Sequence, residues 1–82
     1  MNVSEIEFKY MKEFMVRDLA MMLIRDLGMN IETALDAVYG SRTFELLCDR
    51  ATGFFYQSPL YVYGYLREEI ISGKFNPNPR YA

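Results

Sequence analysis

The chain has 82 residues, of which 51% are hydrophobic and 16% aromatic, so it fits a single domain and is too apolar for a disordered chain. Nine Lys and Arg against eleven Asp and Glu give a formal net charge of −2, which disfavours nucleic acid as a partner because general nucleic-acid binders carry a basic surface. Histidine is absent, which removes the commonest general base and metal ligand. We therefore expect no enzyme, no cofactor, no metal site and no small-molecule substrate.

The first predicted helix covers residues 5–27. Ser4 and Glu7 have the spacing of a capping box, and Gly28 supplies a left-handed residue that ends the helix. Its longest uncharged window covers only residues 19–24, far short of the roughly 20 apolar residues that span a bilayer. The first residues also lack the basic region and continuous apolar stretch of a signal peptide, so we expect a cytoplasmic protein with no membrane partner.

Two shorter helices are expected next. Asn30 is a favourable cap for a helix over residues 31–39, which Gly40 ends. The following helix begins at Ser41 or Arg42 and reaches residue 51. Its spacing predicts one shared face made of Phe44, Leu47, Cys48 and Ala51. The single cysteine is therefore expected to be a buried, reduced thiol.

An aromatic loop at residues 54–57 is expected to lead into the last helix, residues 59–72. Ser58 is a favourable cap, and Pro59 suits the first helical position because no amide hydrogen is needed there. The predicted core face of this helix contains Val62, Tyr63, Leu66 and Ile70. Residues 1–73 are thus expected to form a single, small, all-α four-helix domain with one long N-terminal helix, followed by an extended or disordered tail at residues 74–82.

The first helix is apolar on almost every side. One stripe at core spacing is Val16, Leu19, Ala20, Leu23 and Leu27; a second line is Phe8, Met11, Met15 and Met22; a third is Tyr10, Phe14, Met21 and Ile24. A helix of this length spans ~34 Å, more than the ~30 Å diameter of a compact domain of this size, so two short helices cannot cover it. We predict that the methionines Met11, Met15 and Met22 contribute to a homodimer or to a partner interface. The alternative is a central helix wrapped by the other three.

Two further groups are candidates for the same interface. Asp18 and Arg25 interrupt the methionine line where apolar residues would be expected, so they either pair across a two-fold axis or are solvated. Tyr56, Tyr61 and Tyr65 form a possible amphipathic patch of the kind that is enriched at interfaces. The alternative for the tyrosines is a small core in which the rings are buried and the hydroxyls stay wet.

No pattern of catalytic residues is present. Ser58 as a nucleophile would need a base that the sequence does not offer, and adjacent carboxylates such as Glu68 and Glu69 are expected on a solvated face. The main alternative function is DNA binding by a helix-turn-helix formed by residues 31–39 and 43–50. Its second helix offers Arg42 and Arg50 against two carboxylates and lacks a basic or amide cluster that would face bases, so we favour an interaction module.

The stretch of residues 34–70 resembles short bacterial all-helical proteins of unknown function in its cap, turn and packing residues. The residues that carry the resemblance are Val38, Tyr39, Ser41, Phe44, Leu47, Thr52, Gly53, Tyr56, Gln57, Ser58, Pro59, Tyr61, Val62, Tyr63 and Leu66. Some proteins of that kind are encoded beside larger toxin-like or enzymatic proteins. The resemblance therefore implies a small accessory, antitoxin-like subunit of another protein, and it implies no catalytic residue.

Overall fold

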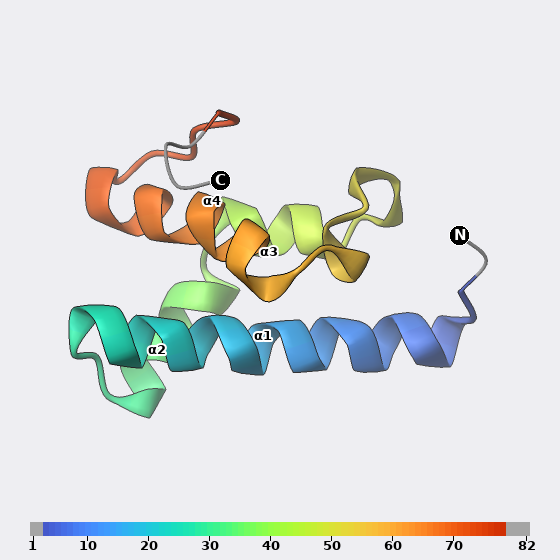
Figure 1. Ribbon diagram of the computed structural model, residues 1–82, viewed down its shortest axis with the longest axis horizontal. Coiled ribbons are helices and arrows are strands. Elements are labelled where there is room, and N and C mark those ends of the chain that lie inside the picture. Colours follow the sequence, from blue (N-terminus) through green and yellow to red (C-terminus); the bar gives the residue numbers. More distant parts are fainter. Residues whose placement is uncertain (1–2, 79–82) are drawn as a thin grey trace.

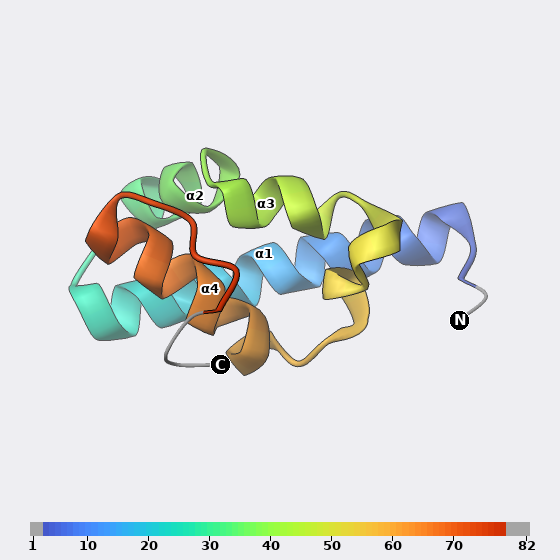
Figure 2. The same ribbon diagram turned by 90° about the horizontal axis from the view of Figure 1, so that it is seen from above.

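One long helix, α1 (Glu5–Leu27), runs along the whole molecule in the computed structural model, which describes residues 3–78 (Figure 1). The longest dimension is 36 Å and the radius of gyration is 12.1 Å, in agreement with the helix length and domain size expected from the sequence. The elements that follow are α2 (Ile31–Tyr39), α3 (Arg42–Leu47), the 3₁₀ helices η1 (Arg50–Thr52) and η2 (Phe54–Tyr56), and α4 (Pro59–Ser72). The all-α, four-helix prediction is confirmed, and residues 3–78 contain no strand. Figure 2 shows α2 and α3 along one side of α1, with α4 lying over its C-terminal half.

The predicted beginnings of α1, α2 and α4 are confirmed by hydrogen bonds of their capping residues. The hydroxyl of Ser4 accepts a hydrogen bond from the Glu7 backbone N–H at 3.2 Å, and the Glu7 carboxylate accepts one from the Ser4 N–H at 3.0 Å. Hydrogen bonding of the Glu7 carboxylate to Ser4, above all to its backbone N–H, lowers the pKa of Glu7 below its usual value. Asn30 caps α2 and Ser58 caps α4 in the same way. Each of these bonds joins residues three apart, which is why the local sequence predicts them.

The third helix is shorter than predicted, because polar side chains form hydrogen bonds with backbone groups that a longer helix would pair with one another. α3 ends at Leu47, and the Asp49 side chain accepts a hydrogen bond from the Ala51 N–H at 3.0 Å. The hydroxyl of Thr52 bonds to the carbonyl oxygens of Leu46 at 2.5 Å and Asp49 at 2.9 Å. Asp and Thr side chains compete with helical bonding in this way, so the chain continues as the separate turn η1.

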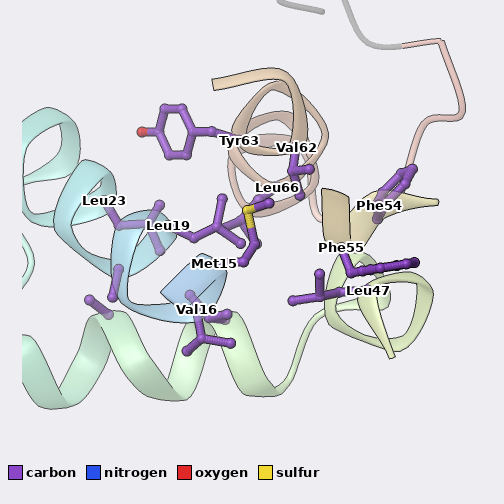
Figure 3. Close-up of a cluster of buried hydrophobic side chains, with 13 residues drawn as sticks. Met15, Val16, Leu19, Leu23, Leu47, Phe54, Phe55, Val62, Tyr63 and Leu66 are labelled. Carbon is purple, nitrogen blue, oxygen red and sulfur yellow. The ribbon is translucent and has the colours of Figure 1, made fainter. Parts of the chain in front are cut away.

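The core lies where α1, α2, α3, η2 and α4 meet (Figure 3). Its fully buried larger side chains are Leu19, Leu23, Val38, Thr43, Leu47, Val62 and Leu66. On α4 the predicted core face is confirmed, with Ile70 partly buried at its edge. The aromatic loop expected at residues 54–57 is instead the 3₁₀ helix η2, and Phe54 and Phe55 are buried in the core. Phe55 packs edge-on against Phe8 of α1, with ring centroids 4.8 Å apart.

A carboxylate of α4 holds the beginning of α3. Glu69 accepts hydrogen bonds from the backbone N–H of Arg42 at 2.6 Å and from the N–H and hydroxyl of Thr43 at 3.0 and 2.8 Å. The expectation that Glu69 lies on a solvated face is therefore wrong. An anion at this position also interacts favourably with the positive end of the α3 dipole.

Tyr63 joins α4 to the end of α1. Its hydroxyl donates a hydrogen bond to Asp26 Oδ2 at 2.8 Å, while Arg25 forms an ion pair with Asp26 at 2.7 Å. The hydrogen bonds from Arg25 and then from Tyr63 lower the pKa of Asp26 to about 2. Burial, followed by the bond to Asp26, raises the pKa of Tyr63 to about 12. Asp26 is thus ionised and Tyr63 neutral over the physiological pH range.

The segment after α4 packs back onto that helix in part. The ring of Phe75 stacks on Tyr65, with centroids 5.7 Å apart and planes inclined by 14°. Asn76 donates a long hydrogen bond of 3.4 Å to Glu68. Residues 74–78 are thus non-helical, as predicted, but docked through one aromatic side chain. The remainder of the predicted tail, residues 79–82, lies outside the described residues.

Candidate protein-binding surface

The predicted methionine interface is mostly packing within the domain. Met15 is 4% exposed and belongs to the core, where it lies near α4 in Figure 3. Met11 and Met22 are partly buried against the same core. The expectation that Met15 faces a partner is therefore wrong, because the second line of α1 turns towards η2 and α4 instead of towards solvent.

The two charges that interrupt the methionine line each pair with a neighbour in the chain. Asp18 accepts a hydrogen bond from Arg17 at 3.3 Å, and Arg25 binds Asp26. The Arg25 guanidinium keeps its charge, since the Asp26 carboxylate raises its pKa further. Both arginine side chains remain about two-thirds exposed, so they still present positive charge at the surface.

The exposed face of α1 consists of three members of its third predicted apolar line together with Ile6, which that prediction did not include. Ile6 is 61% exposed, Tyr10 50%, and Phe14 and Met21 57% each, and these four side chains are here named the outer stripe. They are spaced by four, four and seven residues, which puts them on one side of the helix, opposite the core positions Leu19 and Leu23. Ile24, the last member of the predicted line, is partly buried. The guanidinium of Arg17 lies 5.4 Å from the centre of the Phe14 ring within the stripe.

A groove of about 220 Å³ adjoins the outer stripe at Phe14. Its lining residues are Met11, Phe14, Met15, Asp18, Phe55, Tyr56, Gln57 and Pro59. Met15 and Phe55 are buried and form its floor, whereas Phe14 and Tyr56 are about half exposed and stand at its rim. The groove therefore offers an apolar depression between two aromatic side chains with one carboxylate, Asp18, at the edge.

The three tyrosines proposed as one patch lie in two places. Tyr56 borders the groove and packs edge-on against Phe55, with ring centroids 5.0 Å apart. Tyr61 and Tyr65 lie together on α4, with their hydroxyls 3.0 Å apart, and this bond raises the pKa of Tyr65. Tyr65 also contacts Phe54 and lies under Phe75. Tyr61 is 38% exposed but, like Tyr65, does not line the groove, so Tyr56 is the one of the three that borders it.

A second depression, of about 210 Å³, lies on another side of α1. Its lining residues are Lys9, Lys12, Glu13, Val16, Tyr39, Phe44 and Cys48. The expectation that Cys48 is buried is wrong: α3 ends before it, so the thiol is exposed. Ala51, expected on the same buried face, is exposed for the same reason.

Neither depression has the composition of a metal site. Among residues 3–78, no three His, Cys, Asp or Glu side chains are grouped closely enough to hold a metal ion. No helix in this part of the chain combines the length and the apolar character required to cross a membrane. Comparisons of the chain with protein-family models, with curated proteins and with solved structures find no match, so the geometry and chemistry of the outer stripe and its groove are what bear on function.

Proposed function

We propose that the chain is a cytoplasmic, non-enzymatic interaction module that binds another protein chain through the outer stripe and the groove beside it. The observation that carries the proposal is the exposure of four large apolar side chains on one face of one helix. Continuous apolar patches of several hundred Å² are uncommon on monomeric proteins and mark interaction sites. The bound chain is either a second copy or a larger protein, for which the resemblance implies an accessory role.

The chemistry of the surface supports recognition of protein rather than of a small ligand. Tyr, Phe and Met are the residue types enriched at protein interfaces, and Tyr10, Phe14, Met21 and Tyr56 provide all three. Phe14 lies at the junction of stripe and groove, where a partner side chain in the groove would also cover its ring. Central aromatic residues of this kind contribute most of the binding energy at interfaces.

The test compares Phe14→Glu with Ile71→Glu. Ile71 is 56% exposed on α4, nearly the same as Phe14, but it does not line the groove. Both variants should keep the melting temperature within a few degrees of the wild type, because neither side chain is buried. Association, measured by light scattering for self-association and by comparative affinity capture for other proteins, should be lost in Phe14→Glu and kept in Ile71→Glu. Equal association of all three proteins would contradict the proposal.

The DNA-binding alternative gains no support from the helix that it requires. Arg42 forms an ion pair with Glu45 at 2.6 Å. Arg50 donates a hydrogen bond to the carbonyl of Val3 at 2.8 Å and lies over the ring of Phe8 at 4.6 Å. Both cations are thus engaged within the chain. Duplex binding that weakens steeply with salt and is unaffected by Phe14→Glu would favour DNA over the interaction module.

A further inference from the structure

The outer stripe has the area and the charge distribution to bind another copy of itself. From these two features we infer that the partner is a second copy of this chain, bound with its α1 helix antiparallel across a two-fold axis. This inference rests on the proposed function, since it names the occupant of the same surface.

The apolar area matches that of a stable dimer. A large side chain has about 150–250 Å² of surface, so four that are half exposed present about 400 Å², and the half-exposed Tyr56 adds about 100 Å². A standard interface buries about 800 Å² on each partner, of which about 57%, or roughly 450 Å², is apolar. The stripe and the groove rim thus supply the apolar share of one standard interface without further surface.

The charges beside the stripe favour a second copy in the antiparallel direction. Glu7 is the exposed charge on the N-terminal half of this face, since Lys9, Lys12 and Glu13 line the other depression. On the C-terminal half, Arg17 and Arg25 are more exposed than the aspartates they bind, 67% against 36% and 64% against 27%. Antiparallel helices bring Glu7 of one copy beside Arg25 of the other, whereas parallel helices in register would bring the two Arg17 side chains together.

The spacing along α1 sets the register of the pair. Tyr10, Phe14, Arg17, Met21 and Ile24 follow one another at intervals of four, three, four and three residues, the spacing of a coiled-coil seam. Placing Tyr10 opposite Met21 of the second copy brings Phe14 opposite Arg17 of the second copy. The Arg17 guanidinium, which already lies near its own Phe14 ring, would then lie between two aromatic faces.

The experiment is disulfide trapping in a Cys48→Ser background, which removes the exposed native thiol. Tyr10→Cys and Met21→Cys chains are mixed at tens of micromolar, within the range where a standard interface associates, and are oxidised mildly. The mixed disulfide should exceed either homologous disulfide by roughly tenfold, because only facing positions meet the geometry of the bond. Ile71→Cys, equally exposed but outside the stripe, should stay uncross-linked, and adding Phe14→Glu to the two cysteine chains should abolish trapping.

The outcomes separate this inference from the proposed function. Homologous disulfides that equal or exceed the mixed one would overturn the antiparallel arrangement, and a wild-type chain that stays monomeric by light scattering would overturn the second copy. If that monomer still captured a different protein, and Phe14→Glu alone lost it, the proposed function would stand with another partner. If Phe14→Glu changed neither self-association nor capture, both would fail.

Discussion

Glu69 fixes the beginning of α3 from the neighbouring helix α4, and removing its carboxylate tests how the two helices are held together. Thr43 is fully buried, and both of its donors bind Glu69. A hydrogen bond to a charged group contributes about 1.5–3 kcal/mol, and a buried donor without an acceptor costs about 1–3 kcal/mol. Since Arg42 is exposed, water can replace the acceptor at its N–H. We therefore expect Glu69→Ala to lower the free energy of unfolding by about 3 kcal/mol.

The melting temperature should fall accordingly. In a domain of this size, each 1 kcal/mol shifts it by about 4–8 °C, so a decrease of roughly 12–24 °C is expected. Glu69→Gln should lie between the wild type and Glu69→Ala, because the amide keeps one acceptor oxygen but places a donor group against an N–H. Thr43→Val in the Glu69→Ala background removes the orphaned hydroxyl. The double variant should therefore be less destabilised than the sum of the two single variants.

Urea unfolding followed by far-ultraviolet circular dichroism measures all of these differences. Glu13→Gln is the matched control, because it removes an exposed carboxylate of α1 and should change stability by no more than about 0.5 kcal/mol. If Glu69→Ala unfolded at the same urea concentration as this control, the reasoning about Glu69 would be refuted. Full additivity of Glu69→Ala and Thr43→Val would refute the part that concerns the buried hydroxyl.

Two further predictions concern the packing of α4 and η2 against α1. Tyr63→Phe removes a buried hydroxyl and should cost about 1 kcal/mol at neutral pH. The loss in free energy of unfolding relative to the wild type should shrink as pH falls from 3.8 to about 2, where the folded protein protonates Asp26. It should also shrink as pH rises from 10.0 to about 12, where the folded protein deprotonates Tyr63. Urea unfolding at each pH measures this loss, and a loss that does not change with pH would contradict the Tyr63–Asp26 coupling. Phe55→Ala should lower the free energy of unfolding by about 3–5 kcal/mol in the same assay, because the ring is buried. The control Ile71→Ala should be near neutral, because Ile71 is exposed. A loss below about 1 kcal/mol for Phe55→Ala would mean that η2 does not pack into the core.

The helix ends show what local sequence determines in this protein. Ser4, Asn30 and Ser58 each bind a backbone N–H three residues later, and Gly28 and Gly73 end their helices with positive φ. Both signals depend only on neighbours in the chain and on the conformational freedom of glycine. The four helices and the inward face of α4 were predictable for this reason. The end of α3 was not, because the competing bonds of Asp49 and Thr52 are weak signals beside an apolar spacing that continues to Ala51.

The candidate surface depended on contacts between residues far apart in the chain. The sequence established that α1 is apolar on three lines, and it led us to predict the interface on the line of Met15 and not on the line of Phe14. Only the packing of η2 and α4 decided between them, since it buries Met15 and leaves Phe14 exposed. Likewise Glu69 meets Thr43 across 26 residues, and no spacing rule relates two side chains on different helices. Local bonds and periodicity thus specified the helices, while the docking of helices on one another chose which apolar face stays open to a partner.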